Sequence, residues 1–217
     1  MGDVWAVVVA GGSGSRFGDS RPKQFSDLAG LRLIDWALAS AAAACSGVVA
    51  VLPAAHLHVT LPPGIVAVSG GASRSASVRA GLAVVPDDAA IVVVHDAARP
   101  LASVALFDRV VAAVRGGADG AVPGVAVPDT VKRVDAAGRV VETPDRAALR
   151  AIQTPQAFAA AVLRRAHAGG GEATDDAALV EALGATVVVV EGDPANLKVT
   201  GPDDLARAEV LLDRREA

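Results

Sequence analysis

Cysteine is almost absent from this sequence, because Cys45 is the only one among its 217 residues. A single cysteine cannot form an intramolecular disulfide, which is typical of reducing compartments, so we expect a cytoplasmic protein. The sequence also has only four histidines, so a structural zinc site is not expected. No apolar run approaches the ~20 residues that a membrane-spanning helix needs, and no basic leader precedes the first apolar run. We therefore expect neither a membrane anchor nor a secretory signal.

An excess of positive charge is missing as well. The formal net charge is −4, so no global basic field is present to bind nucleic acid. Lysine is scarce, since Lys23, Lys132 and Lys198 stand against 17 arginines. Where arginine is the default cation, each remaining lysine suggests a need for a compact ammonium. Apolar residues make up 52% of the chain, which is enough for a large core in a single domain over residues 1–217.

Strand and helix patterns alternate along most of the chain. Apolar runs predict strands at 4–10, 47–52, 65–69, 90–95, 120–125 and 186–191. Apolar residues at helical spacing and helix-capping signals predict helices at 33–45, 75–85, 103–115, 157–168, 174–183 and 202–215. Such alternation predicts a three-layer α/β domain with a mostly parallel sheet.

Residues 126–149 interrupt this alternation. Two short β-type runs, 130–134 and 139–143, are joined by Asp135-Ala136-Ala137-Gly138, which is typical of a hairpin loop. An isolated hairpin is marginally stable in water, so we expect this one to pack on another surface, such as a second subunit.

A glycine-rich turn follows the first predicted strand and reads Ala10-Gly11-Gly12-Ser13-Gly14-Ser15-Arg16. A turn at this place in a parallel sheet can bind phosphates through free backbone N–H groups. It matches neither the Walker A pattern nor the dinucleotide pattern, which needs glycine where Phe17 stands. Arg16, Arg21 and Lys23 add cations that would stabilise a triphosphate and its transition state. The alternative is an ordinary turn followed by a solvated basic loop.

A second group, His95-Asp96-Ala97-Ala98-Arg99-Pro100, follows the predicted strand 90–95. In a parallel sheet this group lies on the same edge as the glycine-rich turn. Asp96 would hold a metal ion or a hydroxyl group, and Arg99 a phosphate; the alternative is a helix cap with a surface ion pair. We expect His95 to make a structural hydrogen bond rather than to act as a base.

Four further segments are weaker indicators. Gly70-Gly71-Ala72-Ser73-Arg74-Ser75-Ala76-Ser77 either lines a base or ribose pocket or simply connects a strand to a helix. Lys198 either enters a pocket or extends to solvent. Thr174-Asp175-Asp176 is most simply a helix N-cap with favourably placed acids. No role follows from Gln153-Thr154-Pro155-Gln156 by itself.

Taken in order, these motifs, with Pro22-Lys23-Gln24 and Asn196-Leu197-Lys198-Val199-Thr200, resemble those of the 2-C-methyl-D-erythritol 4-phosphate cytidylyltransferases of the non-mevalonate isoprenoid pathway. The resemblance spans residues 7–208. It implies a Rossmann-like nucleotidyltransferase domain with a protruding β-hairpin arm, 126–149, that exchanges contacts in a homodimer. It further implies that CTP and methylerythritol phosphate are joined with release of pyrophosphate. A divalent ion, usually Mg²⁺, would be held mainly by the CTP phosphates, with Asp96 as a candidate ligand.

The resemblance also implies roles for individual residues. Arg16 and Lys23 would stabilise the transition state, and Arg146 and Lys198 would position the acceptor for attack. The residues expected to contact CTP are Ala10, Gly11, Gly12, Ser13, Gly14, Gly71, Ser77 and Ala97. The residues expected to contact the acceptor are Asp96, Arg99, Thr130 and Thr154. Arg146, Thr130 and Thr154 would reach it from the neighbouring subunit.

Two positions depart from the family pattern. Ala72 stands where the family often has an acidic residue, which removes one base contact, and Gly11-Gly12 stands where many relatives have Ala-Gly.

Four other functions compete with this one. A ribitol-5-phosphate cytidylyltransferase would use the same chemistry with another acceptor, and a related enzyme would transfer another nucleotide, such as UTP, to a sugar phosphate. A CTP-binding protein without turnover is opposed by the joint presence of Arg16, Lys23 and Lys198. A nicotinamide-dependent dehydrogenase is opposed by Phe17.

Overall fold

The computed structural model describes residues 3–11 and 22–216. An eight-stranded sheet forms the centre, with the strand order β10-β7-β11-β6-β1-β4-β5 and with β12 paired to β7. These strands are β1 (Val4–Val9), β4 (Gly47–Leu52), β5 (Ile65–Ser69), β6 (Ile91–Asp96), β7 (Gly120–Ala126), β10 (Arg150–Ile152), β11 (Gln156–Ala159) and β12 (Val187–Glu191). Parallel pairing joins β5, β4, β1 and β6, and also β7 with β12. The predicted mostly parallel sheet is therefore confirmed.

Strands β10 and β11 are antiparallel to their neighbours, and β11 corrects the helix predicted over 157–168. Residues 156–159 form a strand between β6 and β7, and only α4 (Ala160–Ala168) is helical. Ala157 and Phe158 are fully buried there. Burial between two existing strands decided the conformation of this short apolar run, which local sequence leaves ambiguous.

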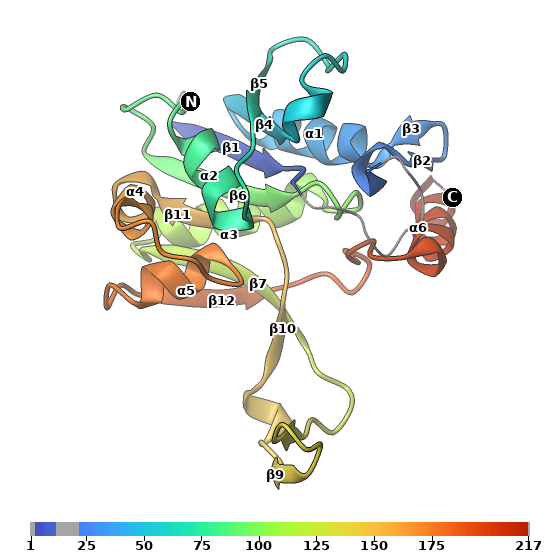
Figure 1. Cartoon of the computed structure of the whole chain (residues 1–217), viewed down its shortest axis with the longest axis vertical. Helices are drawn as coiled ribbons and strands as arrows, with labels where there is room; N and C mark the ends of the chain where they lie inside the picture. The colour runs from blue at the N-terminus through green and yellow to red at the C-terminus, as the bar shows by residue number, and fades with distance from the viewer. Residues whose placement is uncertain (1–2, 12–21, 217) are drawn as a thin grey trace.

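Helices cover both faces of the sheet, as the three-layer prediction requires (Figure 1). On one face α1 (Leu33–Ala44) and α3 (Val104–Arg115) pack against strand residues that include Ala6 and Val8. On the other face α2 (Arg74–Leu82), α4 and α5 (Asp176–Glu181) pack against residues that include Val7 and Val9. Alternate strand residues point to opposite faces, so the apolar run of β1 fills both cores. Full burial of one such valine contributes about 1.5–3 kcal/mol.

A third apolar cluster positions the C-terminal part of the chain. The last helix, α6 (Pro202–Glu216), packs Ala208 and Leu212 against Leu28 of the small β2–β3 hairpin. The hairpin strands are β2 (Asp27–Leu28) and β3 (Leu31–Arg32). The Val199 N–H donates to the Ala98 carbonyl oxygen at 2.8 Å. Residues 196–200 are thereby held next to the carboxyl end of β6.

The hairpin predicted within 126–149 is present and projects from the body (Figure 1). Strands β8 (Arg133–Val134) and β9 (Val140–Glu142) pair antiparallel, and the one-turn 3₁₀ helix η3 (Arg146–Ala148) follows. Val134, Val140 and Val141 are each at least half exposed on this arm. Two further 3₁₀ turns lie in the body, η1 (Lys23–Phe25) and η2 (Ala54–His56). Within the described ranges we find no helix with the length and apolar character to cross a membrane.

Candidate functional site

Three charged side chains meet where β6 ends. The carboxylate of Asp96, the last residue of β6, accepts a hydrogen bond from Lys198 Nζ at 2.6 Å. Arg74, the first residue of α2, donates from Nε to the other oxygen of this carboxylate at 3.4 Å. The carboxyl edge of the sheet thus gathers one acid and two cations from distant parts of the sequence.

The charge of Asp96 is stabilised by these neighbours. Burial by itself would raise the pKa of the Asp96 carboxyl, but the charges of Lys198 and Arg74 outweigh that effect and lower the pKa to about 2. Burial would likewise lower the pKa of Arg74, whereas Asp176 and Asp96 raise it above the ordinary value. The Asp96 carboxyl and the Arg74 guanidinium are therefore both charged near neutral pH.

Behind Asp96, a buried hydrogen-bonded chain fixes its backbone. The Asp96 N–H donates to Thr154 Oγ1 at 3.0 Å, and Thr154 Oγ1 lies 3.1 Å from His95 Nδ1. His95 Nε2 lies 3.2 Å from the Arg99 carbonyl oxygen, which can only accept. Nε2 therefore carries the proton, and the Thr154 hydroxyl donates to Nδ1. Burial lowers the pKa of His95 to about 4, so the ring is neutral and structural, as the sequence predicts.

Arg99 also serves the framework of the site. Its Nη1 donates to the Asn196 carbonyl oxygen at 2.8 Å, and Asn196 Nδ2 donates to the Thr154 carbonyl oxygen at 2.9 Å. Burial lowers the pKa of Arg99, although nearby Asp96 opposes this effect. In this structure Arg99 ties the segment before Lys198 to the end of β6.

Lys23 joins the same edge from the N-terminal half of the chain. It begins η1, and its Nζ donates to the Val199 carbonyl oxygen at 3.0 Å. The neighbouring Gln24 is buried, and its Nε2 donates to the Ala10 carbonyl oxygen at 2.6 Å, just after β1. Lys23 and Lys198 therefore lie on the same side of the molecule.

A pocket of about 620 Å³ opens beside these cations, within the 300–1,000 Å³ typical of small-molecule sites. Its lining among the described residues is Gly11, Pro22, Pro53, Ala54, Gly70, Gly71, Ala72, Ser73, Arg74 and Ser77. The Ser77 hydroxyl donates to the Ser73 carbonyl oxygen at 2.8 Å and accepts from the Gly71 N–H at 3.2 Å. A Cβ on Gly70 would lie 2.9 Å from Ser77 Oγ, so a larger residue there would displace the Ser77 hydroxyl.

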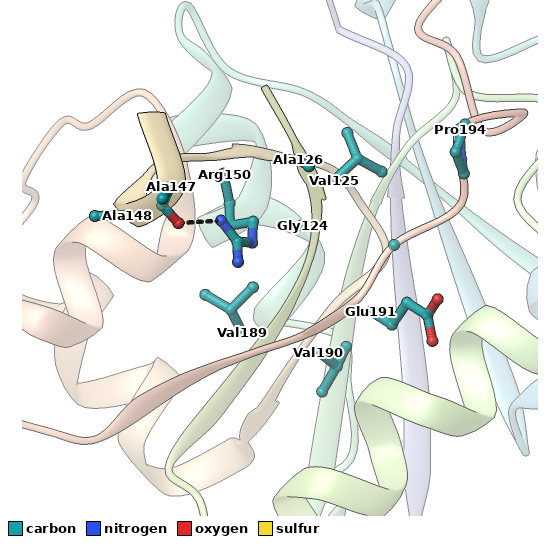
Figure 2. Close-up of a pocket in the computed structure, with 11 residues that line it drawn as sticks. Gly124, Val125, Ala126, Ala147, Ala148, Arg150, Val189, Val190, Glu191 and Pro194 are labelled. Atoms are coloured by element: carbon teal, nitrogen blue, oxygen red, sulfur yellow. Dashed lines mark hydrogen bonds between the residues drawn. The ribbon is translucent and has the colours of Figure 1, made fainter. Parts of the chain in front are cut away.

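A second pocket of about 640 Å³ lies at the base of the arm (Figure 2). It is lined by residues of β7, β10 and β12, among them Val125, Val189 and Arg150. Arg150 Nη1 donates to the Ala147 carbonyl oxygen at 2.9 Å, which turns the guanidinium toward the arm (Figure 2). None of the predicted site residues that the structure describes lines this pocket.

The structure brings together one group of predicted residues: Gly11, Lys23, Gly71, Ser77, Asp96, Arg99 and Lys198 lie at or beside the carboxyl edge. Four predicted residues, Gly12, Ser13, Gly14 and Arg16, lie outside the described residues. Thr130 and Arg146 are exposed on the arm, which leads away from the body (Figure 1), and Arg146 donates to the Pro128 carbonyl oxygen within the arm.

Three predicted contact residues are buried. Thr154 is 5% exposed and belongs to the body rather than the arm, and its hydroxyl contacts the Asp96 N–H and His95 Nδ1. Ala97 is 1% exposed and its side chain joins the core, because its N–H continues the sheet with the Val9 carbonyl oxygen. Ala10 is also buried, and its carbonyl oxygen accepts from Gln24.

Sequence reasoning missed Arg74 and Asp176 as parts of this site. Arg74 is the only charged residue among the glycines and serines of 70–77, which was the available signal. Asp175 caps α5 through the Ala178 N–H as predicted, but the adjacent Asp176 is fully buried and binds Arg74 Nη1 at 2.7 Å.

The arrangement suits phosphorylated ligands. A pocket rimmed by backbone groups leads to Lys23, Lys198 and Arg74, which can neutralise phosphate charge. The part of the chain that the structure describes holds no group of three His, Cys, Asp or Glu side chains able to bind a metal ion. Asp96 lies at the site, but both of its oxygens are engaged by cations.

Comparison with known sequences gives consistent matches. The family model described as IspD, 2-C-methyl-D-erythritol 4-phosphate cytidylyltransferase, matches residues 4–214. A protein of that name from Nocardia farcinica is 49% identical over 223 residues, covering 100% of this chain and 96% of the relative. Another of that name from Rhodococcus opacus is 47% identical over 220 residues, covering 98% and 96%.

Comparison with solved structures agrees. The 2-C-methyl-D-erythritol 4-phosphate cytidylyltransferase from Thermus thermophilus superposes with a TM-score of 0.81 at 38% identity, covering 97% of this chain and 99% of that one. The 4-diphosphocytidyl-2C-methyl-D-erythritol synthase from Anaerococcus prevotii superposes with a TM-score of 0.85 at 26% identity, covering 97% and 98%.

Proposed function

The chain belongs to the 2-C-methyl-D-erythritol 4-phosphate cytidylyltransferase family, and we propose that the carboxyl edge of its sheet is where the family's reaction takes place. The protein is a nucleotidyltransferase that joins CTP and 2-C-methyl-D-erythritol 4-phosphate to give CDP-methylerythritol and pyrophosphate. The observation that supports this location is the convergence of Lys23, Lys198 and Asp96 beside the glycine-lined pocket. A ribitol phosphate acceptor is not favoured, because the matched relatives are named for methylerythritol phosphate.

The reaction is an in-line displacement. An oxygen of the acceptor phosphate attacks the α-phosphorus of CTP, and the bond from that phosphorus to the bridging oxygen breaks, so pyrophosphate leaves with the electron pair. The attacking oxygen is already ionised, which makes a strong general base unnecessary. His95 fits this requirement, because it is neutral and both ring nitrogens are hydrogen-bonded within the protein.

The main barrier to this reaction is the electrostatic repulsion between CTP and the acceptor phosphate. The cations at the carboxyl edge of the sheet reduce this repulsion. Two like charges 4 Å apart cost about 4 kcal/mol at an effective dielectric constant near 20. We assign Lys23, with Arg16, to the charge that develops at the α-phosphate, and Lys198 to the acceptor phosphate. Asp96 would accept hydrogen bonds from acceptor hydroxyl groups, and Arg99 would orient the same substrate by bracing residues 196–198. Gly11, Gly71 and Ser77 would shape the base pocket.

A divalent ion, which we take to be Mg²⁺, would be held chiefly by the triphosphate oxygens, because Mg²⁺ at nucleotide sites uses few protein ligands. When bound, the ion neutralises phosphate charge. Asp96 is a poor ligand while Lys198 and Arg74 occupy its oxygens.

The exposed apolar surface of the arm favours a homodimer. Three of its valines, Val134, Val140 and Val141, are 50–58% exposed, and an isolated hairpin gains little stability alone. The pocket at the arm base is partly apolar, and Val189 in its lining is exposed (Figure 2). Exposed Ile152 of β10 lies beside Gly124, another lining residue. Association with a second copy would cover these surfaces and bring Arg146 and Thr130 of the arm to the other subunit's acceptor site.

The unpaired Cys45, whose pKa burial raises to about 12, suits a reducing cytoplasm.

The proposal is tested with the purified full chain, Mg²⁺ and a pyrophosphate-release assay. Four nucleoside triphosphates are each combined with methylerythritol phosphate and with ribitol 5-phosphate. We expect pyrophosphate release with CTP and methylerythritol phosphate. For each other pair of substrates we expect a catalytic efficiency at least about 100-fold lower, because a mismatched substrate leaves at least one polar group of the site without its partner. Equal efficiency with UTP would show that Ala72 leaves the base pocket unselective.

A further inference from the structure

A chain of polar contacts extends from the acceptor site to buried residues of α5 and α4, which lie on the same face of the sheet as α2. Asp96 binds Arg74 Nε, and Arg74 Nη1 binds Asp176 Oδ2 at 2.7 Å. Asp176 Oδ1 in turn lies 2.9 Å from His167 Nε2. Asp176 is fully buried and His167 is 3% exposed, so this end of the chain is sealed from water.

We infer that Arg74 is a positioning residue that holds the Asp96 carboxylate, and through it the Lys198 ammonium, at the place where the acceptor binds. The inference rests on the proposed location of the acceptor at Asp96 and Lys198. Its structural basis is that one planar guanidinium bridges a buried carboxylate and the carboxylate of the site.

The two contacts of Arg74 differ in strength, which assigns their roles. The 2.7 Å contact with buried Asp176 is short and charge-assisted, so it anchors the guanidinium. The 3.4 Å contact with Asp96 is longer, so it acts through charge and by limiting where the carboxylate can turn. Nη2 is buried without a hydrogen-bond partner among the described residues, so Nε and Nη1 alone set the orientation.

Competition for Asp96 explains why this arrangement matters. Lys198 Nζ lies 2.6 Å from Asp96 Oδ2, and the Lys198 side chain is 43% exposed. Without Arg74, the carboxylate can rotate both oxygens toward the lysine and compete with the acceptor phosphate for its ammonium. With Arg74 in place, one oxygen is retained and Lys198 can turn to the substrate.

A lysine cannot replace Arg74 in this role. Bridging two carboxylates along different directions requires the fixed fork of a guanidinium, whereas an ammonium is a single point of charge. We therefore expect Arg74→Lys to behave like Arg74→Gln, although it keeps the charge.

The test compares Arg74→Gln, Arg74→Lys and Asp176→Asn. Asp176 does not itself line the nucleotide pocket, so its substitution reaches the pocket only through Arg74. We expect the KM for methylerythritol phosphate to rise about 10-fold in both Arg74 variants and about 3-fold in Asp176→Asn, the effect of weakening one charge-assisted hydrogen bond. The KM for CTP should change less than about 2-fold in Asp176→Asn. Arg79→Gln, on the same helix but paired with Glu172 at the surface, is the matched control and should retain normal kinetics.

A double-mutant cycle separates positioning from a general structural role. If Arg74 acts through Asp96, then Arg74→Gln combined with Asp96→Asn loses no more than the more severe single variant. Fully multiplicative losses, or an unchanged acceptor KM in Arg74→Gln and Arg74→Lys beside an impaired Asp96→Asn, would overturn the inference and leave the proposed site intact. An unchanged acceptor KM in Asp96→Asn would overturn both. Thermal unfolding of each variant verifies that the kinetics describe folded protein.

Discussion

Lys198 Nζ lies 2.6 Å from Asp96 Oδ2, although 102 positions separate the two residues in the sequence. The pair keeps an ammonium at the carboxyl edge of the sheet before any substrate arrives, and lowers the pKa of Asp96 to about 2 against the effect of burial. Lys23 donates to the carbonyl oxygen of Val199, the residue that follows Lys198. Two of the three lysines of the chain therefore lie at one edge, where two phosphorylated substrates must meet.

Removing either lysine should impair turnover while the fold persists. We expect Lys23→Ala to lower kcat by about 100-fold or more, the typical cost of losing one preorganised charge at the transition state. Lys198→Ala should lower kcat/KM for methylerythritol phosphate by a similar factor. The measurement is pyrophosphate release, with Arg115→Ala as the control, because Arg115 pairs with Asp3 at the surface. Near-normal turnover in both lysine variants would reject their assignment.

The neutral state of His95 should make stability depend on pH. Its pKa is about 4 in the folded chain and 6.5 for an unperturbed histidine, so between these values the unfolded chain binds more protons. The neutral ring therefore contributes to the free energy of unfolding in full above pH 6.5, and this stabilisation is lost as the pH falls through 4. The total loss is on the order of 3 kcal/mol. Urea unfolding at a series of pH values from 7 to 4 measures the slope of the unfolding free energy against pH.

His95→Gln should flatten that slope, whereas the exposed His58→Gln should retain it. An equal slope in the wild-type chain and in His95→Gln would contradict a neutral buried ring at position 95.

The glycine at position 71 should control nucleotide affinity. A Cβ there would lie 2.5 Å from Ala76 Cβ and 3.1 Å from the Ala76 carbonyl carbon, so Gly71→Ala must displace the turn that lines the pocket. Overpacking of this kind costs about 1–3 kcal/mol, and we expect the KM for CTP to rise roughly 10-fold. Gly169→Ala is the control, because a Cβ there meets nothing within 4 Å. Unaltered CTP kinetics in Gly71→Ala would place the base elsewhere.

The exposed valines of the arm should carry the dimer contact. Val140→Asp, at a residue 58% exposed, should shift the protein toward monomers in sedimentation velocity and lower activity in parallel. Val210→Asp, on α6 and 52% exposed, should change neither. A Val140→Asp variant that still sediments as the wild type does would exclude this part of the arm from the interface.

Shared sites also predict complementation between inactive variants. If Arg146 of one subunit serves the site that holds Lys198 of the other, a mixed dimer of Arg146→Ala and Lys198→Ala contains one intact site. Mixing the two inactive variants should therefore restore measurable pyrophosphate release. No recovery in a mixture that forms mixed dimers would show that each site uses its own arm.

The order of strands and helices was largely readable from the sequence, because each predicted strand is a local apolar run and each helix a local periodic one. The hairpin loop at 135–138 was equally local. The scarcity of lysine indicated Lys23 and Lys198 as candidate site residues, and the order of their motifs along the chain is that of the family.

Only the tertiary structure decided which residues meet. The β11 strand has a short apolar sequence compatible with helix, and its burial between β6 and β7 made it a strand. Ala97 is buried where its N–H continues the sheet to the Val9 carbonyl oxygen. Thr154 is buried where its carbonyl oxygen accepts from Asn196 Nδ2 and its hydroxyl oxygen from the Asp96 N–H. Arg74 and Asp176 are ordinary helix-start residues in sequence, yet they form an ion pair across 102 positions. Local patterns report periodicity and capping, whereas the partner of a charged side chain depends on the order of strands in the sheet, which no local pattern contains.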